Sequence, residues 1–308
     1  MRLHGETADA VRAVLVGAAE RGVRVRLAYN LDHERPMPVP PPPETEPGLV
    51  ESLPFPTVAI PGVPDLMHHK FVIRDRELVW TGSTNWTDDA WSRQENLVLT
   101  VASHRLAARY ERAFERLLET RVVGRAARVR SWPPIGVGGA AVRPWFCPKN
   151  GERLARRIAR AILAARRRIR IASPVITSGP ILRALLARLD AGDVDLAGLV
   201  DRTQMGDVLG HWARDNPDTW KAPVVRAFFA RADFTGKHST PYSPHGLHDF
   251  MHAKATICDD TVFTGSFNLS RSGEQNAEDV LEIRDPALAN RLAAFVDAIR
   301  SRHPRVEV

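Results

Sequence analysis

Two stretches of the chain are near-copies of each other: DLMHHK at residues 65–70 and DFMHAK at residues 249–254. Each is followed by an apolar stretch, an aspartate and a turn of the pattern Gly-Ser-x-Asn, which reads GSTN at 82–85 and GSFN at 265–268. A long internal repeat of this kind indicates a duplicated structural unit. We therefore predict that the chain contains two copies of one fold.

Helices and strands alternate around both copies. Apolar residues at helical spacing predict a closing helix in each unit, at 103–119 and at 286–300. Strands that alternate with helices predict an α/β protein whose sheets are covered by helices. We expect two such units packed as a pseudo-twofold pair: a first unit at 1–121 with a proline-rich insertion at about 36–48, a linker at 122–139, and a second unit at 140–308.

The first unit starts late compared with the second. The second unit is predicted to begin with a helix at 152–166 and a strand at 169–172, followed by a helix at 181–189 and a strand at 194–200. In the first unit, a helix at 8–21 and a strand at 23–28 correspond to the later pair. We therefore expect the first unit to lack its opening helix and strand. Either the chain lacks an N-terminal segment, or the unit is shortened and its sheet is completed in another way.

Composition limits the compartment and the partners. The 308 residues carry a formal charge of +7 and a pI near 10.0, which favours anionic partners such as nucleic acid, phospholipid surfaces or small phosphates. Cys147 and Cys258 are too few for a disulfide framework, and His245 and His248 lack partner ligands at metal-binding spacing. No apolar run has transmembrane length, and the first residues lack the apolar core of a signal peptide. We predict a cytoplasmic protein, with peripheral membrane contact or a signal lost by truncation as open alternatives.

The repeated motif has the chemistry of a phosphate site. In an extended strand, alternate side chains share a face, so each His-x-Lys pair points the same way while His69 points to the other side. Lysine supplies positive charge, and imidazole can act as nucleophile, acid or base near neutral pH. The Gly-Ser-x-Asn turns add hydroxyl and amide groups that we expect to bind phosphate: Ser83, Asn85, Ser266 and Asn268. Two such units could supply a nucleophile on one side of a phosphorus atom and an acid on the other.

This arrangement resembles the phospholipase D superfamily, in which His-x-Lys-x4-Asp is followed by Gly-Ser-x-Asn. The resemblance extends from about residue 8 to the last helix, and the two aspartates fall on the strand face opposite the lysines, which implies a supporting role. A single motif would be weak evidence, but a duplicate with matching turns is strong. The resemblance implies a phosphodiesterase without metal or cofactor. The matching catalytic residues are His68, Lys70 and Asp75 in the first copy and His252, Lys254 and Asp259 in the second.

The resemblance also implies individual roles. In that family, a carboxylate beyond the asparagine hydrogen-bonds the motif histidine, and Glu95 and Glu278 fit this position. Such a carboxylate fixes the tautomer and stabilises the imidazolium. The implied mechanism forms a covalent phosphohistidine, which is then hydrolysed or transferred to another alcohol. We expect His68 to be the nucleophile and His252 the general acid, with the reverse assignment open.

The substrate must be inferred from the segments that flank the motifs. No lysine or arginine occurs between Arg35 and His68, and residues 53–64 are largely apolar, which suits an acyl chain or a bilayer surface better than a nucleic-acid backbone. Residues 221–237 are basic with Phe228 and Phe229 interleaved, which suits single strands or anionic lipid headgroups. The sequence therefore favours a phospholipid substrate. A nuclease and a catalytically inactive anion-binding scaffold are the alternatives.

Overall fold

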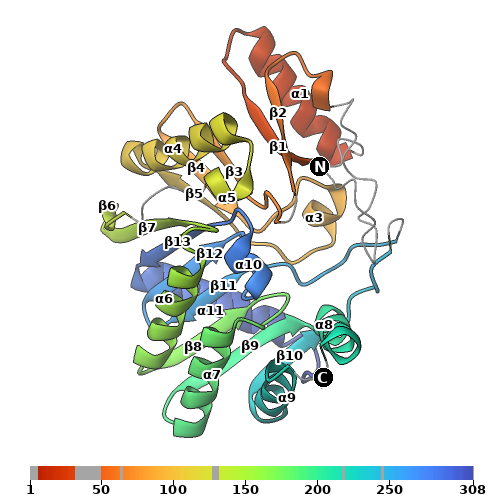
Figure 1. Ribbon diagram of the computed structural model, residues 1–308. Helices are drawn as coiled ribbons and strands as arrows, with labels where there is room; N and C mark the ends of the chain where they lie inside the picture. Colours follow the sequence, from red (N-terminus) through yellow and green to blue (C-terminus); the bar gives the residue numbers. More distant parts are fainter. Residues whose placement is uncertain are drawn as a thin grey trace.

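The largest sheet of the computed structural model has eight strands in the order β10-β9-β8-β11-β12-β13-β7-β6 (Figure 1). Strands β8, β9 and β10 are parallel, and the other neighbours are antiparallel. The structure describes residues 6–31, 50–62, 65–126, 132–216, 219–243 and 246–307, so the predicted proline-rich insertion lies outside the described residues. The strands of this sheet are β6 (Ile135–Val137), β7 (Ala140–Phe146), β8 (Arg168–Ala172), β9 (Asp195–Asp201), β10 (Asp233–Lys237), β11 (Ala255–Cys258), β12 (Thr261–Gly265) and β13 (Asp279–Arg284).

Helices cover both faces of this sheet, because apolar side chains of its strands point from each face into a separate hydrophobic core. On β8, Ile169 and Ile171 point into the core under α6, α7 and α9, whereas Arg170 points the other way and donates to Asp297 of α11 at 2.8 Å. Asp285 caps the first turn of α11 through the backbone N–H of Leu288. The helices of this half are α6 (Gly151–Ala164), α7 (Gly179–Ala191), α8 (Arg202–Asp215), α9 (Lys221–Arg231), α10 (Arg271–Gln275) and α11 (Pro286–Arg300).

The first half repeats this plan with a gap. A parallel pair, β1 (Leu27–Leu31) and β2 (Thr57–Pro61), corresponds to β9 and β10, and an antiparallel sheet, β3 (Phe71–Arg74), β4 (Leu78–Gly82) and β5 (Val98–Ala102), corresponds to β11, β12 and β13. In the second half, β8 joins β9 to β11. Among the described residues of the first half no strand joins β1 to β3, so its sheet is split in two. The expected lack of the opening helix and strand is confirmed for the described residues.

The helices of the first half are α1 (Glu6–Glu20), α3 (Asp88–Ser92), α4 (His104–Thr120) and α5 (Val123–Ala126). Two sequence predictions differ from the structure in this region, and one strand was not predicted. The strand predicted at 23–28 begins and ends later, as β1. The linker predicted at 122–139 contains α5 and the edge strand β6, which pairs with β7, and β7 itself was not foreseen. No helix in the described part of the chain is long and apolar enough to cross a membrane.

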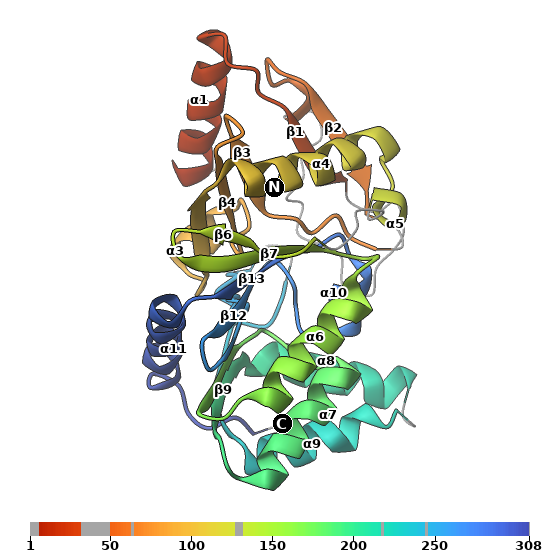
Figure 2. The same ribbon diagram turned by 90° about the vertical axis from the view of Figure 1, so that its left-hand side faces the viewer.

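The two halves meet along β7 and share a core, and Figure 2 shows β6 and β7 running between them. Tyr110 of α4 and Val79 of β4 pack in one cluster with Phe146 and Leu281 of the second half. The buried carboxylate of Asp279 accepts hydrogen bonds from three first-half side chains: Thr81 at 2.5 Å, Tyr110 at 3.0 Å and His69 at 3.2 Å. This shared core holds the two motifs in one place.

Candidate active site

Backbone hydrogen bonds cross between the halves at both motifs. The N–H of His68 donates to the carbonyl of Ala277 at 2.9 Å, and the N–H of His252 donates to the carbonyl of Glu95 at 3.0 Å. Each motif occupies the extended segment just before its strand, β3 or β11, rather than the strand itself. Each histidine is therefore anchored beside the segment that follows the Gly-Ser-x-Asn turn of the other half.

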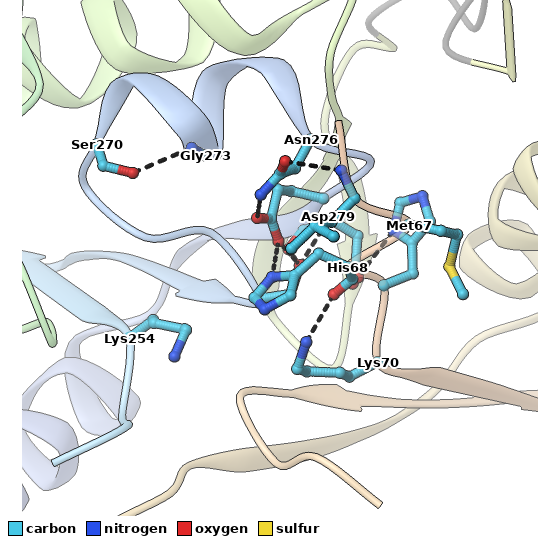
Figure 3. Close-up of polar contacts among 12 residues, drawn as sticks. Met67, His68, Lys70, Lys254, Ser270, Gly273, Asn276 and Asp279 are labelled. Atoms are coloured by element: carbon cyan, nitrogen blue, oxygen red, sulfur yellow. Dashed lines mark hydrogen bonds and ion pairs between the residues drawn. The ribbon is translucent and has the colours of Figure 1, made fainter. Parts of the chain in front are cut away.

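The partner of His68 is a carboxylate from the second half (Figure 3). The Nδ1 atom of His68 lies 2.8 Å from Oε2 of Glu278, whose side chain is fully buried. The hydroxyl of Ser266 donates to the same oxygen at 2.5 Å, and Nδ2 of Asn276 lies 3.4 Å from Oε1. Because Glu278 accepts, Nδ1 of His68 carries the hydrogen and Nε2 keeps its lone pair. The structure thus places Glu278 where an orienting carboxylate is needed.

The partner of His252 is Asn96, not the predicted Glu95. Oδ1 of Asn96 lies 3.1 Å from Nδ1 of His252 and accepts from the hydroxyl of Ser83 at 2.7 Å. Glu95 instead forms an ion pair with Lys237 at 2.7 Å. The sequence comparison failed by one residue because the Ser-to-partner spacing is 13 in the first half and 12 in the second. That extra residue was visible in the sequence and would have pointed to Asn96.

Both motif lysines are buried beside these histidines, and Figure 3 shows Lys70 and Lys254 next to His68. The ammonium of Lys70 donates to the carbonyl of His68 at 2.8 Å, and that of Lys254 donates to the carbonyl of His252 at 2.6 Å. Within the described chain, no carboxylate lies within 4.0 Å of either ammonium. Burial lowers the pKa of Lys70 to about 8, and burial together with the charge of Lys70 lowers the pKa of Lys254 well below its usual value. Two buried cations without such a partner form a strong anion site.

The same environment keeps both imidazoles neutral without substrate. Burial lowers the pKa of His68, an effect that Glu278 opposes and the two lysines reinforce. Burial lowers the pKa of His252 still further, and Lys254, Lys70 and His68 add to it. The backbone hydrogen bonds of His68 and His252 to the opposite half bring both motifs to the boundary of the halves. A bound phosphate would reverse the trend by supplying negative charge.

The residues of the Gly-Ser-x-Asn turns divide into two groups. Ser83 and Ser266 hold Asn96 and Glu278, as described, and each hydroxyl also accepts a backbone N–H, so they support the histidine partners. The predicted role of these serines in binding phosphate is therefore replaced by a positioning role. Oδ1 of Asn268, a hydrogen-bond acceptor, is buried and has no partner in the described part of the chain. Asn85, its counterpart in the first half, is partly exposed.

The two motif aspartates lie away from the histidines, in the turns that follow β3 and β11. Asp75 lies in the turn between β3 and β4, with its carboxylate largely exposed beside Arg74. Asp259 lies in the equivalent turn between β11 and β12, where it accepts the backbone N–H groups of Arg166, Arg167 and Arg168. Both adopt positive φ angles, 53° and 51°, which Asp tolerates better than most residues. They are residues of turn structure.

The structure also bears on metal binding. His248 is stacked between the rings of Tyr242 and Phe250, and its Nε2 lies 2.9 Å from the carbonyl of Ser243. His245 lies outside the described residues. No group of three or more His, Cys, Asp or Glu residues in the described ranges is arranged to hold a metal ion.

Comparison with known proteins connects this geometry to a family. A family model described as "Cardiolipin synthase, PLD-like domain" matches residues 3–118 and 158–300. A segment of 54 residues, 17% of this chain, is 46% identical to the mitochondrial cardiolipin hydrolase of Xenopus laevis and spans 25% of that protein. The activity of the whole Xenopus protein is therefore not carried over.

Solved structures agree on the fold. Phosphatidylserine synthase from Haemophilus influenzae Rd KW20 superposes with a TM-score of 0.68 at 14% identity, covering 99% of this chain and 81% of that one. Polyphosphate kinase from Porphyromonas gingivalis superposes with a TM-score of 0.61 at 12% identity, covering 98% of this chain and 42% of that one. At such identities the likeness concerns the fold alone. Because the family model matches most of its length, the chain belongs to the PLD-like domain family of the phospholipase D superfamily.

Proposed function

We propose that the protein is a phosphodiesterase that cleaves the phosphodiester of phospholipids through a phosphohistidine intermediate. One observation carries this proposal: two histidines, each bound at Nδ1 by a side chain of the other half, lie at the boundary of the halves with two buried lysines that have no carboxylate within 4.0 Å in the described part of the chain. Lysines held in this way stabilise the charge of a phosphoryl group in the transition state. The two imidazoles supply the nucleophile and the proton donor.

The proposed reaction has two steps. In the first, Nε2 of His68 attacks phosphorus, the bond to the leaving oxygen breaks, and the imidazolium of His252 gives its Nε2 proton to that oxygen. In the second, neutral His252 removes a proton from water or another alcohol, whose oxygen attacks phosphorus and releases His68. Asn268 and Asn85 are proposed to donate to the phosphoryl oxygens. Glu278 stabilises the positive charge that the His68 ring carries in the intermediate.

Two features support a lipid over a nucleic acid. The segment before the first motif lacks lysine and arginine from residue 36 to residue 67. The aromatic residues that could have stacked on bases, Phe228 and Phe229, are buried against Phe234 in the core. Base stacking requires exposed aromatic faces, so the expected stacking platform is absent from this helix. Leu247, five residues before His252, is half exposed and adds apolar surface near the second motif.

The direct test is a parallel assay of purified protein on phosphatidylcholine, cardiolipin, single-stranded DNA and bis(p-nitrophenyl) phosphate, with and without EDTA. We expect lipid turnover that EDTA does not reduce, and loss of turnover in His68→Ala and in Lys254→Ala. Cleavage of DNA without lipid turnover would favour the nuclease alternative. Anion binding without turnover of any diester would favour the inactive scaffold.

The assignment of the two histidines has its own test. p-Nitrophenolate leaves without protonation, so His252→Ala should release one equivalent of it from bis(p-nitrophenyl) phosphate and then stall, because no base activates water. Mass spectrometry should find the phosphoryl group on His68. His68→Ala should give no burst. A burst in His68→Ala with none in His252→Ala would reverse the two roles.

A further inference from the structure

The two histidines have different partners in otherwise matched surroundings. His68 faces the carboxylate of Glu278, and His252 faces the amide of Asn96. In both halves a serine hydroxyl holds the partner, Ser266 in one and Ser83 in the other. The pseudo-twofold repeat therefore differs at the histidine partner, where an amide replaces a carboxylate.

The orientation of the Asn96 amide is fixed by its own contacts. Its Nδ2 donates to the carbonyl of Ala90 at 2.9 Å and lies 3.4 Å from Oε1 of Gln94. Its Oδ1 is left to face His252 and the hydroxyl of Ser83. An acceptor at this place requires the hydrogen on Nδ1 of His252. Nε2 is then the ring atom that exchanges a proton with the substrate.

The difference in charge has a chemical consequence. A phosphorylated imidazole that keeps its Nδ1 hydrogen is positively charged, and a carboxylate stabilises that charge far better than an amide does. A general acid has the opposite need, because it must give its proton away. The groups whose positive charge disfavours the imidazolium of His252 are Lys254, Lys70 and, when protonated, His68. Because the Asn96 amide is neutral, only the negative charge of the substrate stabilises the imidazolium of His252. The ring therefore releases its proton readily.

We propose that Asn96 is the positioning residue of His252, and that the amide at Asn96 and the carboxylate at Glu278 commit His252 to acid–base catalysis and His68 to nucleophilic attack. This inference rests on the proposed function and goes beyond it, because it explains why the two copies of the motif are not interchangeable. It also assigns a role to a residue outside both His-x-Lys motifs.

The test compares two leaving groups on one lipid: phosphatidylcholine, whose choline alkoxide needs a proton, and phosphatidyl-p-nitrophenol, whose phenolate does not. The quantity measured is the single-turnover rate of forming the phosphatidyl-enzyme. Asn96→Ala should slow this step on phosphatidylcholine roughly 10- to 100-fold and on phosphatidyl-p-nitrophenol less than about 3-fold, because acid catalysis contributes only to the first. Glu278→Gln should slow both substrates equally. Equal losses on both substrates in Asn96→Ala would overturn the proposal.

Asn96→Asp provides a second measurement that does not depend on removing the side chain. A carboxylate at position 96 would favour the imidazolium of His252, so the acid would stay protonated to higher pH. The alkaline limb of the pH–rate profile with phosphatidylcholine should move up by about one pH unit or more. An unmoved limb, or a shift toward lower pH, contradicts the proposed role.

Controls separate this inference from the proposed function and from misfolding. Ser92→Ala, in the neighbouring helix α3, removes an exposed hydroxyl that donates to the carbonyl of Asp88 and should leave both rates unchanged. Melting curves of each variant report folding. If the wild-type protein cleaves only nucleic acid, the lipid assignment fails, and the same comparison uses a dinucleotide and a nucleotide p-nitrophenyl ester. If it cleaves no diester, both proposals fail.

Discussion

At the scale of single residues, the buried lysines are the main conflict between stability and function. Lys70 and Lys254 are nearly inaccessible to solvent and face each other's charge, so each ammonium is held in the fold at a cost. Lys237 is a contrast, because it lies against the carboxylate of Glu95 at 2.7 Å. A bound phosphoryl group would add negative charge beside the motif lysines, which otherwise feel only the more distant carboxylates of Glu278 and Asp279.

We predict that Lys70→Met makes the protein more stable and inactive. The pKa of Lys70 is about 8 in the folded protein and 10.5 without burial, so between these values the unfolded chain binds more protons and the stability of the wild type rises with pH. In Lys70→Met this rise should shrink, and the free energy of unfolding at pH 7 should increase by about 1–3 kcal/mol. Urea denaturation from pH 7 to pH 10 measures both effects.

Lys237→Met is the matched control for that experiment. It removes a lysine that has a carboxylate partner, so it should lower the free energy of unfolding at pH 7 by leaving Glu95 unpaired. If Lys70→Met also lowered stability at pH 7, the ammonium of Lys70 would not be the strained group described here.

At the scale of elements, the spacing of residues in the sequence predicted the closing helix well. The same spacing did not show that the motif aspartates lie in turns. The closing helix predicted at 286–300 has these bounds in the structure, where Pro286 stands in the first turn and Asp285 caps it. The repetition of the motif aspartates placed them in the predicted catalytic set, and both lie in turns. Asp259 repeats because the turn needs a residue that accepts a positive φ, and its carboxylate also accepts three backbone N–H groups.

We predict that Asp259→Ala lowers stability and spares catalysis. Three backbone N–H groups at Arg166, Arg167 and Arg168 lose their acceptor, which should reduce the free energy of unfolding by about 1–3 kcal/mol. The kcat of the folded variant should stay within about 2-fold of wild type, since a turn residue makes no transition-state contact. Asp75→Ala, whose carboxylate is largely exposed, should change stability by less than about 0.5 kcal/mol. A kcat loss of 100-fold in either variant would restore the catalytic assignment.

At the scale of the whole molecule, the site exists only because the halves share a core. The carboxylate of Asp279 is fully buried and accepts hydrogen bonds from Thr81, Tyr110 and His69 across the boundary. Its neighbour Glu278 holds His68 from the same strand end. One short segment of the second half therefore both joins the halves and orients the catalytic histidine of the first.

We predict that Asp279→Asn weakens the junction between the halves. The amide keeps the shape of the side chain but turns an N–H donor toward groups that are themselves donors, which should lower the free energy of unfolding by about 1–3 kcal/mol. Hydrogen exchange measured separately in β4 of the first half and β13 of the second across a urea series should show whether the halves still unfold together. Asp260→Asn, which removes a surface partner of Arg167, is the control and should have little effect. Unchanged stability in Asp279→Asn would mean that the apolar core alone joins the halves.

The duplicated unit, the late start of the first unit and the two His-x-Lys pairs could all be predicted from the amino-acid order. These features depend on local order, since alternation along an extended segment fixes which side chains share a face. The partner of each histidine, in contrast, depends on how distant segments pack. His68 and Glu278 are 210 positions apart, and His252 and Asn96 are 156 apart. Spacing along the chain specifies the face of a segment on which a side chain lies, but not the residues that pack against that face. The pairing of each histidine with a residue of the other half, including Asn96 in place of Glu95, therefore depends on how the two halves pack together.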